Sequence, residues 1–94
     1  MAGTYSVELR PAADKWLDRQ PKKLQAAILA RITALGTEPR PIGVETLAGT
    51  RDVLRIRVGG FRVLYRVDDQ DRRVTVVALG PRGQAYKPRQ LKRL

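Results

Sequence analysis

The chain has 94 residues, the length of one domain, and its 43% hydrophobic and 30% charged residues are typical of a globular protein. Its net charge is +10, and it contains no cysteine or histidine, which excludes disulfides, thiolate or imidazole metal sites and histidine-based catalysis. No apolar run approaches the ~18 residues of a membrane span, and no apolar signal segment is found, so we expect a single cytoplasmic domain over 1–94 with no cofactor, metal or membrane partner.

The first 36 residues predict a strand followed by two helices. Residues 4–9 alternate in polarity and indicate a short strand, which ends before Pro11 because proline suits the first turn of a helix. A helix is expected over 12–20 and a second over 21–36, with Gly36 as its C-terminal cap. The second helix carries apolar residues at helical spacing, namely Leu24, Ile28, Ile32 and Leu35.

The second half of the chain changes to a period of two. A connection rich in proline and glycine spans 37–52, and its Leu47 is expected to fill the edge of the core. Beyond it the alternation predicts strands at 53–58, 61–67 and 73–79. The last two of these strands are joined by the acidic turn 68–71.

The glycine pair Gly59-Gly60 predicts a tight hairpin and fixes its register. With the residues that flank the turn facing each other, Arg57 lies directly opposite Arg62, and Arg55 falls on the same face two residues along. Like charges in such a position destabilise a sheet by about 0.2–1 kcal/mol per pair. A function is a better explanation of this face than solvation alone. The whole face carries Arg55, Arg57, Arg62 and Arg66.

The other face of the hairpin is apolar and predicts where the helices pack. We therefore expect an α+β fold, in which an N-terminal strand and a helical hairpin lie on one face of a mostly antiparallel sheet. The arginine-lined face is expected to stay open. Residues 51–94 carry twelve basic and four acidic residues, and such an excess favours a polyanionic ligand, most often nucleic acid.

The segment "GGFRVLYRVDD", followed by "LGPRGQAY", resembles the C-terminal half of RelE-type toxins of bacterial type II toxin–antitoxin systems, in the RelE/ParE superfamily. The similarity extends over about 5–87. It implies the RelE-like fold and a ribosome-dependent endoribonuclease that cuts mRNA in the ribosomal A site. In that reaction the ribose 2′-hydroxyl attacks the neighbouring phosphate and leaves a 2′,3′-cyclic phosphate.

The resemblance also implies roles for individual residues. Arg55 and Arg57 would orient the RNA and assist deprotonation, and Arg62 would stabilise the phosphorane. Arg82 would lie near the leaving oxygen, and Tyr86 would stack on or position a base. Together with the basic surface, the resemblance predicts that RNA is bound by Arg55, Arg57, Arg66, Arg73 and Lys87.

Two departures from the family pattern bear on the chemistry. Pro81 stands where many relatives have histidine, and the pair Arg55 and Arg57 stands where lysine is found in others. Since arginine is a poor proton acceptor, we expect catalysis by charge stabilisation, with proton transfer helped by rRNA or water.

The expected partners are an acidic, RelB-like antitoxin, the ribosome and mRNA. Two alternative functions remain open. One is inhibition of DNA gyrase, as implied by the ParE branch of the superfamily. The other is RNA binding without catalysis by a basic domain.

Overall fold

A computed structural model of the chain describes residues 4–81, and all structural statements below refer to that range. Two helices and five strands follow one another along it. They are β1 (Ser6–Leu9), α1 (Pro11–Asp18), α2 (Lys22–Ala34), β2 (Glu45–Thr46), β3 (Leu54–Val58), β4 (Phe61–Asp68) and β5 (Arg73–Pro81).

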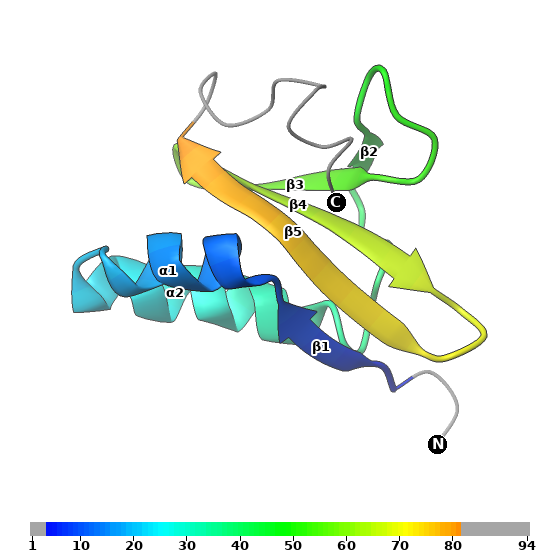
Figure 1. Cartoon of the computed structure of the whole chain (residues 1–94), viewed down its shortest axis with the longest axis horizontal. Helices are drawn as coiled ribbons and strands as arrows, with labels where there is room; N and C mark the ends of the chain where they lie inside the picture. The colour runs from blue at the N-terminus through cyan, green and yellow to red at the C-terminus, as the bar shows by residue number, and fades with distance from the viewer. Residues whose placement is uncertain (1–3, 82–94) are drawn as a thin grey trace.

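The strands form one sheet in the order β1-β5-β4-β3-β2. β1 runs parallel to β5 and the other neighbours are antiparallel. Figure 1 shows both helices on one side of this sheet. The expected α+β architecture is therefore confirmed, with β2 as an additional short strand inside the connection at 37–52.

The main core lies between the helices and the sheet. α1 begins at Pro11, as expected, and buries Ala13 and Leu17, while α2 buries Ile28 and Ile32. These side chains pack against a row of strand residues on the near face of the sheet. That row comprises Ile56, Val63, Tyr65, Val74, Val76 and Leu79.

Gly36 is required for a different reason from the one expected. Among the glycines of the described range, only Gly43, Gly49 and Gly59 have positive φ, so Gly36 does not form a left-handed cap. Instead, a Cβ atom at Gly36 would lie 2.9 Å from the carbonyl oxygen of Tyr5. The absence of a side chain lets Tyr5, the residue before β1, approach the end of α2 and donate a hydrogen bond from its backbone N to Gly36 O at 2.7 Å.

The β3–β4 hairpin has the expected register. Val58 pairs with Phe61 and Arg57 pairs with Arg62 across a turn in which Gly59 has a φ of +60°. The end of the hairpin is held against α1, because the rings of Phe61 and Trp16 meet edge to face with centroids 5.7 Å apart.

The expectation of a fully open second sheet face is wrong. A smaller apolar cluster of Leu47, Val53, Leu64 and Val77 lies on that face, so Leu47 covers it rather than filling the edge of the main core. Leu64 lies on that face by alternation with Arg62 and Arg66, and a β-bulge adds Val77 to the cluster. Leu64 pairs with Ala78 and Tyr65 with Val76, which leaves Val77 as an extra residue on β5.

Two polar contacts fix the connection between α2 and β2, and a third holds the carboxylate that one of them uses. The buried hydroxyl of Tyr65 donates a hydrogen bond to the carbonyl oxygen of Pro39 at 2.6 Å. Arg40 binds both carboxylate oxygens of Asp69 at 3.1 and 3.0 Å, and the Tyr5 hydroxyl donates to the same carboxylate at 2.7 Å. The connection is thus tied to β4 and to the β4–β5 turn, and the same turn is bound by Tyr5, the residue before β1.

We predict that Tyr65→Phe lowers the free energy of unfolding by about 1–3 kcal/mol, because it leaves a buried carbonyl without its donor. Tyr5→Phe is the matched control and should cost much less, since the Tyr5–Asp69 contact is exposed. Urea unfolding of the three proteins at neutral pH measures the difference. Equal stability of wild type and Tyr65→Phe would contradict the assigned role of this hydrogen bond.

The stabilisation by the Tyr65–Pro39 hydrogen bond should also depend on pH. Burial raises the pKa of Tyr65 to about 12, against an ordinary value of 10.0. Because the folded state holds this proton more tightly, the stabilisation is complete below pH 10 and is lost as the pH rises from 10 to 12. The difference in stability between wild type and Tyr65→Phe should therefore shrink over that range.

Candidate functional site

The β3–β4 hairpin brings three of the predicted catalytic residues together. Arg57 and Arg62 are direct cross-strand partners, and Arg55 lies two residues along β3 on the same face. We call Arg55, Arg57 and Arg62 the arginine cluster. The tight Gly59-Gly60 turn sets the register, so the glycine pair determines which side chains meet.

The arginine cluster is only partly exposed to solvent. Arg57 is exposed, whereas Arg55 and Arg62 are half-buried. The side chain of Arg55 is 20% exposed, and its Nε is buried without a hydrogen-bond partner among the described residues. A guanidinium whose stem is held against the sheet loses little freedom on binding an anion, and partial burial strengthens its attraction.

Glu45 is a member of this site that the sequence analysis missed. β2 pairs with β3 so that Glu45 lies directly opposite Arg55, and the Arg55 Nη2 donates a hydrogen bond to Glu45 Oε1 at 2.6 Å. This hydrogen bond lowers the pKa of the Glu45 carboxyl, and the positive charges of Arg55, Arg57 and Arg62 lower it further. The carboxylate is therefore ionised at neutral pH and lies within the field of the whole cluster.

Arg66 and Arg73 lie farther along the sheet. Arg66 follows Arg62 by four residues on β4, about 13 Å away, and its Nε lies 3.5 Å from Asp52 Oδ1. Arg73 begins β5 at the opposite end from the arginine cluster, where it pairs with Asp68. Both arginines line a polar hollow of about 480 Å³ whose other charged residues, Asp52, Asp68 and Asp69, are acidic. The structure does not bring Arg73 to the arginine cluster.

Three predicted site residues, Arg82, Tyr86 and Lys87, lie outside the described range. β5 ends at Pro81, which pairs with Phe61 in the row beside Arg62.

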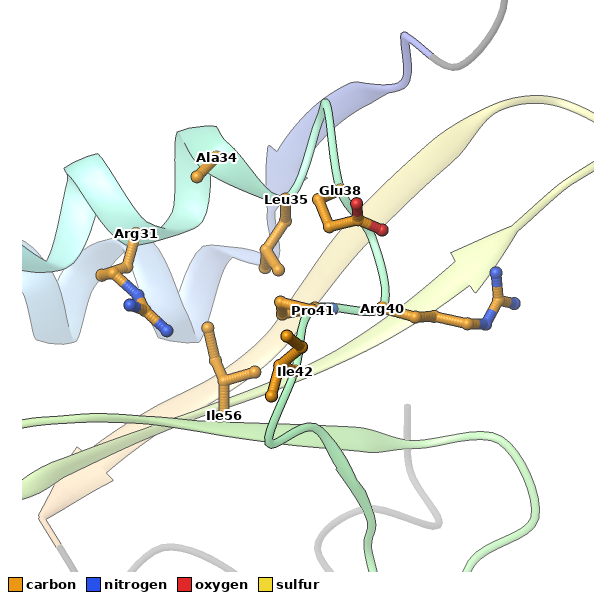
Figure 2. A pocket seen from close by; sticks show the side chains of 8 residues that line it. All are labelled: Arg31, Ala34, Leu35, Glu38, Arg40, Pro41, Ile42 and Ile56. Carbon is orange, nitrogen blue, oxygen red and sulfur yellow. The ribbon is translucent and has the colours of Figure 1, made fainter.

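A second hollow lies on the helix side of the sheet, away from the arginine cluster. It has a volume of about 530 Å³ and a lining of five apolar and three charged residues, and we call it the α2–β3 hollow. Figure 2 shows Ile56 of β3 below the end of α2, with Pro41 and Ile42 beside it and the Arg40 side chain pointing away. Ile42 is 103% exposed, so this connection presents a large apolar side chain entirely to solvent. The lining residues are Arg31, Ala34, Leu35, Glu38, Arg40, Pro41, Ile42 and Ile56.

Residues 7–86 match the family described as "ParE toxin of type II toxin-antitoxin system, parDE". The chain belongs to the RelE/ParE toxin superfamily of type II toxin–antitoxin systems. A match over this range covers most of the sequence, including both helices and the β3–β4 hairpin. A search of curated proteins gives no match.

Solved structures of RelE toxins are similar to this member of the superfamily. The archaeal RelE of the RelE–RelB complex from Pyrococcus horikoshii OT3 is 34% identical, with a TM-score of 0.75, over 87% of this chain and 99% of that one. The RelBE2 toxin–antitoxin complex from Mycobacterium tuberculosis contains a chain that is 26% identical, with a TM-score of 0.75. The match covers 84% of this chain and 99% of that one. A free mutant RelE from E. coli has 22% identity and a TM-score of 0.76 over 97% and 98%, which shows the shared fold.

Within the described residues, no helix is long and apolar enough to cross a bilayer.

We predict that Arg57→Gln raises the free energy of unfolding by about 0.2–1 kcal/mol, because it removes one of two like charges facing each other across the sheet. The gain should shrink between low and high salt, since screening already weakens this repulsion in the wild type. Arg51→Gln, which removes an exposed arginine outside the cluster, is the matched control. Urea unfolding at two salt concentrations is the measurement, and a salt-independent or destabilising effect would argue against repulsion.

Proposed function

We propose that this protein is a toxin that inhibits translation by cutting mRNA in the ribosomal A site. The observation that carries the proposal is the cross-strand pair Arg57–Arg62, together with Arg55 on the same face. Guanidinium groups bind phosphate through paired hydrogen bonds and stay protonated at any working pH. The sequence identity of 34% to an archaeal RelE, over almost the whole of that chain, supports the same proposal.

The energetic balance of the arginine cluster favours an anionic ligand. Facing like charges cost about 0.2–1 kcal/mol. A phosphate about 4 Å from one guanidinium is attracted by about 4 kcal/mol at an effective dielectric constant of about 20. An arrangement that is mildly unfavourable alone thus becomes favourable once a phosphate lies between the two arginines.

The proposed reaction is attack of the ribose 2′-oxygen on the adjacent phosphorus, which forms a cyclic phosphate and breaks the bond to the 5′-oxygen. Arg55 and Arg57 would orient the RNA, and Arg62 would stabilise the additional negative charge of the phosphorane. Arg82 and Tyr86 are proposed, from the family resemblance alone, to act at the leaving oxygen and on a base. Arg66 and Lys87 would bind the RNA backbone beyond the cluster.

A second candidate function is inhibition of DNA gyrase, which the match to the ParE toxin family favours. That activity would not need the arginine cluster to face a scissile phosphate. Binding of RNA without cleavage is a third possibility, because the chain contains no histidine. Mapping of mRNA ends and assays of gyrase-linked DNA breaks in the same arrested cells separate the three.

We also propose that an acidic antitoxin of the RelB type neutralises this toxin. Several of the similar structures are toxin–antitoxin complexes, and the net charge of +10 favours an acidic partner. The α2–β3 hollow, with the exposed Ile42 at its rim, is the surface on which we expect an apolar part of such a partner to bind.

For catalysis, we predict that Arg62→Ala slows mRNA cleavage by about 10²–10³, by analogy with the loss of other groups that stabilise a transition-state charge. Arg82→Ala should have a comparable effect. Primer extension on mRNA from programmed ribosomes measures both. Arg19→Ala, an exposed arginine at the end of α1, is the control and should cleave like the wild type.

Equal cleavage by wild type and Arg62→Ala would exclude the arginine cluster as the catalytic site. Growth arrest with intact mRNA and gyrase-linked DNA breaks would instead support the ParE-type activity.

For antitoxin binding, we predict that Ile42→Glu weakens the complex about tenfold or more while changing the stability of the toxin by less than about 0.5 kcal/mol. The reason is that Ile42 is fully exposed in the free toxin and would be buried by the partner. Leu29→Glu is the matched control, because Leu29 is also an exposed apolar residue but does not line the hollow. Titration calorimetry with the product of the neighbouring gene measures affinity. Unchanged binding by Ile42→Glu would exclude this hollow as the contact.

A further inference from the structure

The polar hollow at the far end of β4 and β5 lies on the same face of the sheet as the arginine cluster. Arg66 pairs with Thr75, and Asp68 pairs with Arg73, so the four side chains share one face. Arg66 also shares this face with Arg62, because the two are four residues apart on one strand. A single extended strand of RNA can therefore reach both the arginine cluster and the hollow.

The charge of the hollow makes it a poor site for phosphate. Three aspartates and two arginines line it, together with Gln70 and Thr75, whereas the arginine cluster carries three guanidinium groups. A lining of many hydrogen-bond donors and acceptors with little net charge suits a neutral polar group instead. The neutral polar groups of an RNA strand are its bases, and proteins recognise unpaired bases through their hydrogen-bonding edges.

Asp52 is the carboxylate of the hollow that is best able to bind a ligand. Asp69 is held by the contacts that tie down the connection between α2 and β2, and Asp68 Oδ1 accepts a hydrogen bond within the β4–β5 turn at 3.0 Å. The side chain of Asp52 is 69% exposed, and its ion pair with Arg66 Nε is 3.5 Å long, which is too long for a strong hydrogen bond. Both oxygens of Asp52 can therefore accept hydrogen bonds from a ligand.

Asp52 and Arg73 together offer the groups that guanine needs. Guanine is the common RNA base with two adjacent donors, N1–H and the N2 amino group, and a carboxylate accepts two such donors side by side. The other edge of guanine carries the acceptors O6 and N7, which an arginine binds with two donors. Arg73 is exposed and lines the same hollow, whose volume of about 480 Å³ exceeds that of a single base.

We propose that the polar hollow binds an unpaired guanine of the RNA. Asp52 accepts hydrogen bonds from N1–H and the N2 amino group, and Arg73 donates to O6 and N7. This proposal rests on the proposed action on RNA and adds recognition of sequence to it, because phosphate contacts at the arginine cluster carry no sequence information. Arg66 positions the carboxylate of Asp52 through their ion pair. The guanine belongs to the mRNA or to ribosomal RNA, which present the same base.

The first experiment measures binding of the isolated protein to short uridine strands, 2′-O-methylated against cleavage, by fluorescence anisotropy at physiological salt. One central base is guanine, inosine, which lacks the N2 amino group, or adenine, which lacks both donors. The wild type should bind the guanine strand about 5- to 100-fold more tightly than the adenine strand, with the inosine strand between them. Equal affinity for guanine and adenine would overturn the proposal.

Each variant is judged by the ratio of its affinities for two strands, because a change of net charge alters binding to all strands alike. Asp52→Ala should bind the guanine and inosine strands equally. Asp71→Ala, which removes the same charge from the β4–β5 turn outside the hollow, should keep the wild-type ratio. Arg73→Gln should lose the preference for guanine over 7-deazaguanine, which lacks N7, and Arg72→Gln should keep it. A wild-type ratio in Asp52→Ala, or loss of the ratio in Asp71→Ala, would overturn the assignment.

Programmed ribosomes identify the source of the guanine. If it belongs to the mRNA, replacing the guanines around the A-site codon by inosine should weaken wild-type binding and leave Asp52→Ala unaffected. If it belongs to ribosomal RNA, Asp52→Ala should weaken binding whatever the mRNA sequence. Equal ribosome binding by Asp52→Ala and Asp71→Ala, together with no effect of inosine, would overturn the proposal. A wild type that prefers guanine but leaves mRNA intact would contradict the proposed cleavage and support the guanine site.

Discussion

The opposition of Arg57 and Arg62 across the β3–β4 pair is the constraint on which the candidate site depends. Two positive charges are held at neighbouring positions by backbone pairing, so neither can move away without a change of register. The carboxylate of Glu45, bound to Arg55 at 2.6 Å, compensates part of this charge in the free protein. The site is therefore stable without a ligand and still has an excess of positive charge for a phosphate.

The two faces of the sheet have separate roles in this account. The helix-side face buries the main core and ends at the α2–β3 hollow, where Ile42 is exposed. The other face carries the arginine cluster, and its smaller apolar cluster around Leu64 holds the middle of the sheet between Arg62 and Arg66. An antitoxin bound at the hollow and an RNA bound at the arginine cluster would thus contact different surfaces of one small domain.

Local patterns in the sequence predicted the parts of the fold that depend on short-range rules. The Gly59-Gly60 turn and the alternation around it predicted the pairing of Arg57 with Arg62, because turn length fixes register. Glu45 was missed because β2 has only two residues, too few to show a period, and its partner Arg55 is ten residues away. The side of the sheet that Leu47 covers was predicted wrongly because the partners of Leu64 on that face include Val77, the extra residue of a bulge that alternation does not reveal. Gly36 was correctly predicted to follow the second helix, but its role was predicted wrongly. It is needed for the close approach of the chain around β1 and not as a left-handed helix cap.

The most direct test of the central claim is a structure of the toxin on a programmed ribosome whose mRNA carries a 2′-O-methyl group at the A-site codon to prevent attack. This account predicts the scissile phosphate within hydrogen-bond distance of Arg57 and Arg62. A phosphate bound elsewhere, with the arginine cluster facing solvent and no RNA near it, would contradict the account.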